Sequence, residues 1–312
     1  MILPASRSAL NSQTKLSSDP KTTVSLVICT RNRPLQLQSC LEAIGHLDPR
    51  PDEVLVVDNT EGDEETKGIA QRYGARYSTA PTKGLSRARN RGMKESLCDV
   101  VAFLDDDAVP DEHWLQFLLE PFADPNVAAV TGSIRTPDMP PGTVEGRSPL
   151  LINHEVEEWF EVATFGGLGW GSNMALRRAA CVSPKIFDER LGRGAPFQIA
   201  EENYAFAKLL SRGHTVAYIP AAVVNHPPLK RSNIEQEARN SITFWLLLFS
   251  EFPQQRIALL RFLIRRLQHK SLRWPRDPQG PGDIINSGWG VKLKAGFTGL
   301  FLFLKTPKPR DE

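Results

Sequence analysis

Short apolar runs alternate with amphipathic segments through the first 135 residues of the chain. The apolar runs have the length and composition of buried strands, and the segments between them repeat their apolar residues every three or four positions, which predicts helices. This alternation is typical of a mostly parallel sheet covered by helices on both faces. The predicted strands are Val24 to Cys29, Glu53 to Val57, Ala75 to Thr79, Val100 to Leu104 and Val127 to Ile134, and the predicted helices are Pro34 to Gly45, Glu64 to Tyr73, Leu85 to Leu97 and Glu112 to Phe122.

The pattern changes after residue 135. The stretch from Thr136 to Pro149 is rich in proline and glycine and predicts a linker or a loop. The segments that follow predict a mixed organisation with two helices beyond Ser232, the second of which has one apolar face formed by Ile257, Leu260, Ile264 and Leu267. The other predicted elements are helices at Glu155 to Val162 and Asn203 to Arg212, a glycine-rich loop at Gly166 to Gly171, and strands at Ser172 to Leu176, at Thr215 to Ile219 (ending at Pro220) and at Ala221 to Val224.

Three regions are expected from these patterns. Residues 1 to 22 are rich in Ser, Thr, Pro and Lys and predict a mobile tail without the apolar stretch of a signal peptide. Residues 23 to 228 are expected to form one α/β domain with two halves, at 23 to 135 and at 150 to 228. Residues 229 to 312 are expected to form a basic helical extension.

Charge is distributed unevenly along the chain. The net charge is +2, but residues 256 to 312 contain twelve Lys/Arg and four Asp/Glu, giving +8, so residues 1 to 255 carry −6. A basic end suggests an anionic partner such as a phospholipid surface, and two helices packed on the sheet domain are the alternative. No apolar run approaches the ~18 residues that span a bilayer. The four cysteines show no close pairing, so we expect a cytoplasmic protein, with the inner membrane face as an optional location.

Three consecutive carboxylates, Asp105, Asp106 and Asp107, follow the apolar run that ends at Leu104. Mutual repulsion makes such a cluster costly unless a cation neutralises it. Hard oxygen ligands suit Mg²⁺ or Mn²⁺, which commonly share their coordination with substrate phosphates. A solvated acidic turn that caps the next helix is the alternative interpretation.

Other polar groups fall at the carboxyl ends of predicted strands, where open α/β sheets bind ligands. The segment from Thr30 to Pro34 combines two arginines with a helix start and suits an anion, and Asp58 ends the second strand. Ordinary turn and capping roles would also explain both. The basic helix start from Lys83 to Gly92 can point Ser86, Arg89 and Asn90 to one side, or it is simply a solvated cationic face.

The second half of the chain adds fewer candidates. Glu201 and Glu202 open a predicted helix, where they gain from its macrodipole or serve as a general base. His226 follows a predicted strand and is either a packed side chain or a ligand. Trp170 could stack on a ligand or pack in the core.

Together these segments resemble family-2 glycosyltransferases with the GT-A fold. The resemblance runs from about Val24 to His226. No single segment is decisive, but their order and spacing are specific. The segments that carry it are Val24 to Pro34, Glu53 to Asp58, Gly84 to Gly92, Phe103 to Asp107, Gly171 to Arg178, Phe187 to Gly194, and Glu201-Glu202.

The resemblance implies a Rossmann-like sheet and an inverting, metal-assisted transfer from a nucleotide-diphosphosugar to an acceptor hydroxyl. It also implies that residues 23 to 135 form the nucleotide-binding half of the domain and residues 150 to 228 the acceptor half. It implies Asp105 and Asp107 as the D-x-D element and Glu202 as the base, in a position where relatives usually carry Asp, so Glu201 remains an alternative. The residues that it assigns are Thr30, Arg31, Arg33, Asp58, Arg89, Asp105 and Asp106 for the donor, Asp105, Asp107 and His226 for Mg²⁺ or Mn²⁺, and Trp170, Gly171 and Asn173 for the acceptor.

The expected partners are a nucleotide-sugar donor and a carbohydrate, lipid-linked or small-molecule acceptor, as in polysaccharide biosynthesis, with no nucleic acid. Two rival interpretations remain. Asp105 to Val109 also fits the D-x-D-x-[TV] signature of phosphatases with an aspartyl nucleophile, although the accompanying downstream motifs are missing. The presence of Glu at position 202, where relatives usually carry Asp, also fits a relative that binds nucleotide sugars without turnover.

Overall fold

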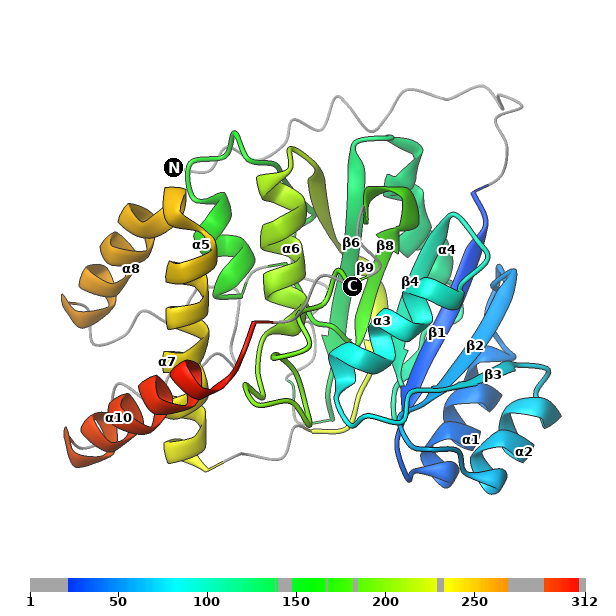
Figure 1. Cartoon of the computed structure of the whole chain (residues 1–312). Coiled ribbons are helices and arrows are strands. Elements are labelled where there is room, and N and C mark those ends of the chain that lie inside the picture. The colour runs from blue at the N-terminus through cyan, green and yellow to red at the C-terminus, as the bar shows by residue number, and fades with distance from the viewer. Residues whose placement is uncertain are drawn as a thin grey trace.

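One mixed sheet runs through the molecule (Figure 1). The computed structural model describes residues 22–137, 139, 148–166, 168–181, 185–228, 233–268 and 289–308. The strand order is β3-β2-β1-β4-β8-β6-β9-β5, with β7 also paired to β9. The strands are β1 (Val24–Thr30), β2 (Glu53–Asp58), β3 (Arg76–Thr79), β4 (Val100–Asp105), β5 (Val109–Pro110), β6 (Val127–Arg135), β7 (Leu150–Ile152), β8 (Asn173–Arg177) and β9 (Thr215–Asn225).

Strand direction divides the sheet into two parts. Strands β3, β2, β1 and β4 are parallel, as the strand-helix alternation predicted. Strand β8 runs antiparallel between β4 and β6, so a strand from the second half of the chain joins two strands from the first half. Strand β6 pairs with β9 in parallel. The carboxyl ends of β1, β2 and β4 therefore meet at one edge of the sheet.

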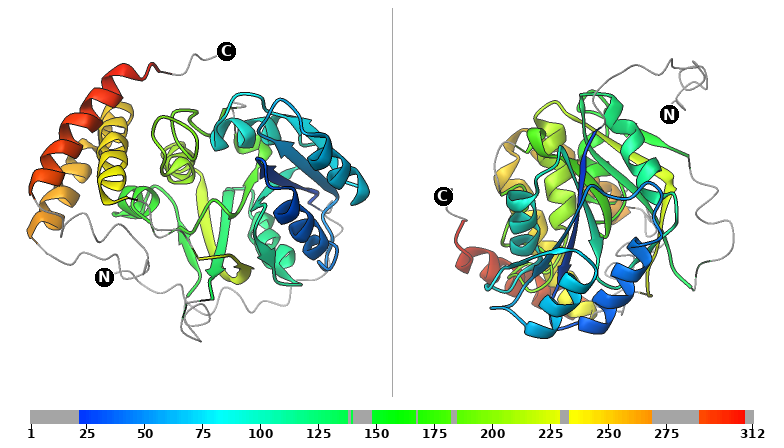
Figure 2. Two further views of the ribbon diagram at one scale, coloured as in Figure 1. Left: turned by 90° about the horizontal axis from the view of Figure 1, so that it is seen from below. Right: turned by 90° about the vertical axis from the view of Figure 1, so that its right-hand side faces the viewer.

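Helices cover both faces of the sheet (Figure 2). Successive strand residues point to opposite faces, and each face must be buried because the strands are apolar on both sides. Val27, Val57 and Phe103 contribute to the core shared with α3, α5 and α6, whereas Ile28 and Leu104 contribute to the core shared with α1, α2 and α4. The helices of the sheet domain are α1 (Pro34–Ile44), α2 (Glu64–Arg72), α3 (Leu85–Glu95), α4 (Trp114–Leu119), α5 (Trp159–Thr164) and α6 (Glu201–Ser211).

The predicted α/β architecture, with a mostly parallel first half of the sheet and a C-terminal helical extension, is confirmed. The extension consists of α7 (Ile234–Glu251), α8 (Arg256–Gln268) and α10 (Trp289–Lys305), which lie at the end of the molecule away from β3 (Figure 1). The region between α8 and α10 lies outside the described residues, as do the predicted N-terminal tail up to residue 21 and most of the loop between β6 and β7. Over the described parts of the chain, every helix falls short of the length and apolar character needed to cross a bilayer.

Several element boundaries differ from the predictions. Strand β9 continues through Pro220, where we expected the strand to end, because a register shift against β6 leaves Pro220 to Ala222 unmatched and no ladder N–H is needed there. The predicted helix from Glu112 to Phe122 is shorter and ends in a 3₁₀ turn over Glu120–Ala123. The short strands β5 and β7 were not predicted.

The side chain of Asn173 links β6, the bulge in β9 and α4 by hydrogen bonds. It is fully buried, and its Nδ2 donates to the carbonyl oxygens of Ser133 and Ala222 at 2.8 Å each. Its Oδ1 accepts from the indole N–H of Trp114 at 2.8 Å. One amide therefore satisfies polar groups of β6, the bulge in β9 and α4, which is a structural role.

We expect Asn173→Ala to lower the free energy of unfolding by about 3–5 kcal/mol. Three buried polar groups lose their partner at roughly 1–3 kcal/mol each, and relaxation of the neighbouring groups keeps the total toward the lower end of the sum. Urea denaturation of the full chain measures the change. The matched control Asn126→Ala removes an exposed amide and should stay within about 0.5 kcal/mol of the wild type. Equal stability of the two variants would contradict the role assigned to Asn173.

Candidate functional site

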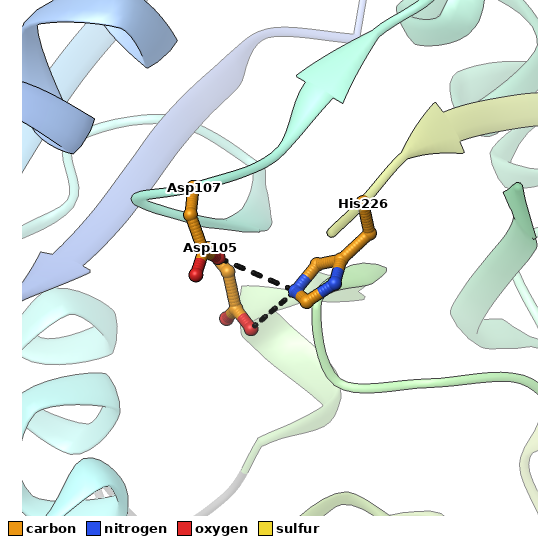
Figure 3. Close-up of side chains that lie close together, drawn as sticks. All are labelled: Asp105, Asp107 and His226. Carbon is orange, nitrogen blue, oxygen red and sulfur yellow. Dashed lines mark ion pairs between the residues drawn. The ribbon is translucent and has the colours of Figure 1, made fainter. Parts of the chain in front are cut away.

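Two carboxylates and a histidine meet at the carboxyl edge of the sheet. Asp105 ends β4, Asp107 follows in the next turn, and His226 comes directly after β9. The Nε2 atom of His226 lies 3.3 Å from Asp107 Oδ1 and 3.7 Å from Asp105 Oδ2. Figure 3 shows the three side chains pointing toward one another. One ligand atom from each lies within 4.8 Å of the others, so the three could share one metal ion.

Hydrogen bonding fixes which nitrogen of His226 faces the carboxylates. Its Nδ1 lies 2.7 Å from the carbonyl oxygen of Pro227, which can only accept, so Nδ1 carries a proton. Nε2 is therefore the atom available to a metal, an arrangement typical of ligating histidines. Burial alone would lower the pKa of His226, but its hydrogen bonds to Asp105 and Asp107 raise that pKa to about 10.

The contacts with His226 also lower the pKa values of Asp105 and Asp107. The hydrogen bond from His226 holds the pKa of Asp107 at about 2, with Arg33 contributing. Burial raises the pKa of Asp105, but His226 and the charge of Arg89 outweigh burial and lower it. Both groups are thus anionic at neutral pH, as metal ligands must be.

Asp106 faces a different set of partners from its two neighbours. Its Oδ2 accepts from the hydroxyl of Thr30 at 2.7 Å, and its Oδ1 pairs with Arg33 Nη1 at 2.7 Å. Arg33 also reaches Asp107 Oδ2 at 2.9 Å. Burial nonetheless raises the pKa of Asp106. The triplet is therefore divided, with Asp105 and Asp107 toward His226 and Asp106 toward β1.

The predicted donor residues at β1 and β2 lie next to this cluster in the sheet. Arg31 donates to the carbonyl oxygen of Asn59. Asp58 is fully buried, and its Oδ2 accepts from the Asp63 N–H at 3.0 Å and the Tyr77 hydroxyl at 2.8 Å. Its other oxygen, Oδ1, has no partner among the described residues. A buried carboxylate oxygen without a donor is costly, so this atom suits a donor group on a ligand.

Arg89 is buried, and its guanidinium is occupied by contacts within the protein. Its Nη1 pairs with Glu201 Oε1 at 2.8 Å. Its Nη2 donates to the carbonyl oxygen of Gly171 at 2.9 Å and lies 3.5 Å from Asp105 Oδ1. The predicted donor residue Arg89 thus connects β4, the loop before β8 and α6.

The two adjacent glutamates at the start of α6 have different surroundings. Glu201 is buried and paired with Arg89, whereas Glu202 remains partly exposed. Although the residue is partly exposed, desolvation of its carboxyl group and the nearby charge of Glu201 raise the pKa of Glu202 to about 7. The charge of Arg89 and hydrogen bonds from backbone N–H groups, including that of Gly171, act in the opposite direction. A carboxylate with a pKa near neutrality is suited to accept a proton.

Two backbone positions make this arrangement possible. A Cβ atom at Gly171 would lie 2.7 Å from Nη1 of Arg89, so the close approach of the loop to the guanidinium requires glycine there. Ala200, the residue before α6, has φ of 59°, a left-handed conformation that is uncommon for alanine. Strain of this kind is tolerated where surrounding structure fixes the backbone, as at the turn that aims Glu201 and Glu202.

The three predicted acceptor residues fall into different environments. Trp170 is partly exposed and lies in the loop before β8, and Gly171 belongs to the contact with Arg89. Asn173 is fully buried, and its side chain makes the contacts with β6, β9 and α4 described above.

Two asparagines fix loops around the site, and the sequence analysis assigned neither of them a structural contact. Asn59 donates to the carbonyl oxygens of Ala80 and Thr82 and accepts from the Gly84 N–H, so it fixes the loop that leads into α3. Its position directly after Asp58 at a strand end was the available signal. The side chain of Asn90 donates to the carbonyl oxygen of Phe187 and accepts from its N–H. These residues are 97 positions apart, so no local sequence pattern predicts the contact.

Comparison with known proteins shows which family the chain belongs to. The model of the family "Glycosyl transferase family 2" matches residues 25–182, half of the chain. Glycosyltransferase AglE of Haloferax volcanii is 31% identical over 143 residues, which are 43% of this chain and 47% of that protein. Succinoglycan biosynthesis protein ExoM of Rhizobium meliloti is 28% identical over 228 residues, 68% of this chain and 69% of that protein. The chain thus spans about half to two thirds of these relatives.

Among solved structures, mannosyltransferase PcManGT from Pyrobaculum calidifontis, in complex with GDP-Man and Mn²⁺, is similar with a TM-score of 0.54 and 16% identity. The likeness covers 90% of this chain and 74% of that one, and it concerns the fold. Together with the match over residues 25–182 and the acidic strand end, it identifies the protein as a member of glycosyl transferase family 2 with the GT-A fold.

Proposed function

We propose that this protein is an inverting glycosyltransferase that moves a sugar from a nucleotide-diphosphosugar to an acceptor hydroxyl. The observation that carries the proposal is the cluster of Asp105, Asp107 and His226 at the carboxyl edge of the sheet. Family membership supports the reaction class. The aspartyl phosphatase alternative has no comparable support, because Asp105, its candidate nucleophile, is engaged by His226 and Arg89.

Asp105, Asp107 and Nε2 of His226 would hold Mg²⁺ or Mn²⁺. Two carboxylates and an imidazole suit Mn²⁺ well, and the similar mannosyltransferase PcManGT is described with Mn²⁺. A metal at Nε2 would take the place of the proton that this nitrogen shares with the carboxylates. When bound, the ion would neutralise charge on the departing diphosphate.

The donor would lie along the ends of β1 and β2. Arg33 offers a cationic group beside Asp107 and suits the diphosphate, with Arg31 and Thr30 nearby. Asp58 Oδ1, which lacks a partner among the described residues, suits a hydroxyl or N–H group of the nucleoside. Arg89 would act indirectly by holding Asp105 and Glu201 in place.

Glu202 is the proposed general base. The choice between the two glutamates follows from their partners, because Glu201 is committed to Arg89 and Glu202 is not. Glu202 would take the proton of the acceptor hydroxyl as that oxygen attacks the anomeric carbon opposite the leaving diphosphate, which inverts the configuration. Its pKa of about 7 keeps a useful fraction ionised at neutral pH while leaving it basic enough to accept the proton.

A carbohydrate or lipid-linked acceptor is the proposed substrate class. Trp170, partly exposed in the loop beside Glu202, offers a surface for stacking on a sugar ring. The ExoM relative is described as a succinoglycan biosynthesis protein, which favours a role in polysaccharide synthesis.

The donor identity is tested directly by incubating the full chain with UDP-, GDP-, dTDP- and CMP-sugars, with and without Mn²⁺, while following thermal stability and nucleotide release. A ligand of the folded state raises the melting temperature. We expect one nucleotide class to stabilise the protein in the presence of Mn²⁺ and to be hydrolysed slowly. No stabilisation by any of them would contradict the proposed function.

We predict that Glu202→Gln lowers kcat/KM by about 10²–10⁴-fold while donor affinity changes little, because only the base is lost. In the wild type, the base must be ionised, so kcat/KM should rise with pH and level off above about 7. Steady-state kinetics across pH measures both effects. Glu112→Gln, at an exposed position, is the matched control. A full loss in Glu201→Gln with an active Glu202→Gln would reverse the assignment.

We predict that His226→Ala and Asp107→Ala each weaken Mn²⁺ binding by at least about 10-fold, since each removes one ligand atom. Isothermal titration of the full chain with Mn²⁺ alone measures the change. His113→Ala removes an exposed histidine outside the cluster and should leave the affinity unchanged. Undiminished Mn²⁺ affinity in the Asp107 variant would reject the metal site.

A further inference from the structure

The outermost helix carries an apolar stripe on its solvent-facing side. Phe297, Leu300, Phe301 and Leu304 of α10 are spaced so that they share one face of the helix, and all four are exposed, with Phe297 at 75% and Leu304 at 72%. The opposite face packs on α7, where Gly299 lies against Ile242. A surface helix normally reverses this pattern, with polar residues outward.

Helix α8 repeats the arrangement. Leu259 and Phe262 are buried, whereas Ile257, Leu260 and Ile264 form an exposed stripe on the other side. Both helices lie in the outer layer beyond α5 and α6 (Figure 1), and the view from below in Figure 2 shows α10 running alongside α7. Most of the large, exposed apolar side chains of the described residues belong to these C-terminal helices.

The charged residues that α8 and α10 themselves carry are all cationic. Arg256 and Arg261 flank the stripe of α8, and Lys294 and Lys305 flank that of α10. Lys294 pairs with Glu235 of α7, and Lys305 lies over the ring of Phe301. Neither α8 nor α10 contains an acidic residue. Apolar residues flanked by cations are typical of helices that lie in the interface of an anionic membrane.

We propose that the outward faces of α8 and α10 dock on an anionic lipid bilayer, with the phenylalanine and leucine side chains entering the headgroup boundary and the arginines and lysines contacting lipid phosphates. A second copy of the chain is a poorer occupant, because a two-fold contact of α10 on α10 would set cationic groups against each other. The proposal concerns lipid binding and does not depend on the proposed transfer reaction.

The docked helix would lie close to the loop that leads into α6. Phe303 of α10 stacks on Phe197 with ring centroids 6.3 Å apart, and Phe197 lies four residues before Glu201. Gln236 of α7 also donates to Gln198 of the same loop. If the proposed function holds, a lipid-linked acceptor would thus be presented beside Glu202, a consequence that rests on that function.

Flotation of the full chain with vesicles tests the proposal. We expect binding to vesicles of phosphatidylglycerol and phosphatidylcholine at low salt, at least tenfold less binding to pure phosphatidylcholine, and weaker binding at high salt. The double variant Phe297→Ser with Phe301→Ser should lose at least tenfold in binding, and Arg261→Glu should lose binding to anionic vesicles. Leu97→Ser, at a 69% exposed position near the start of β4, is the matched control and should bind as the wild type does.

Two outcomes would overturn the proposal. One is a wild-type chain that stays with the unbound fraction on anionic vesicles at low salt. The other is a dimer, detected by light scattering, that the double substitution dissociates while vesicle binding is absent. Slow donor hydrolysis in the absence of lipid is measured on the same samples, so that a failure of docking is distinguished from a failure of the proposed reaction.

Discussion

The buried guanidinium of Arg89 is the interaction on which the rest of the site depends. Isolated in the interior, a cation would be strongly disfavoured, and its pairing with Glu201 and Asp105 together with the Gly171 carbonyl compensates that cost. Because these partners come from α6, β4 and the loop before β8, one side chain sets the distance between the acidic strand end and the first turn of α6. Glycine at position 171 is a direct consequence of this contact.

The site contains carboxyl groups whose pKa values are shifted in opposite directions. On the β4 side, His226 and Arg33 hold the pKa of Asp107 at about 2, so it stays anionic. On the α6 side, burial and Glu201 raise the pKa of Glu202 to about 7. Pairs of carboxyl groups whose surroundings separate their pKa values are suited to separate tasks, one electrostatic and one in proton transfer.

The parallel strands and the acidic strand end were predictable because both are local. Alternating apolar segments specify β1 to β4, and strand ends expose polar residues such as Asp58 and Asp105 at one edge. The contacts of Arg89 with Glu201 and of Asn173 with Ser133 could not be predicted, since they join residues 112 and 40 positions apart and depend on how elements pack. The family resemblance assigned both residues to ligands, and the structure adds that both side chains are buried and hydrogen-bonded within the protein. The continuation of β9 through Pro220 could not be predicted either, because a bulge forms only against the partner strand, here β6.

The position of β8 also has a consequence for biosynthesis. Strands β4 and β6 are complete by residue 135, but they are not neighbours, and β8 at Asn173–Arg177 must lie between them. A nascent chain emerges amino end first, so the half-built sheet would expose two unpaired strand edges while some forty further residues are translated. Closure of the sheet therefore has to wait until β8 has left the ribosome, and chaperone binding during that interval would protect the open edges.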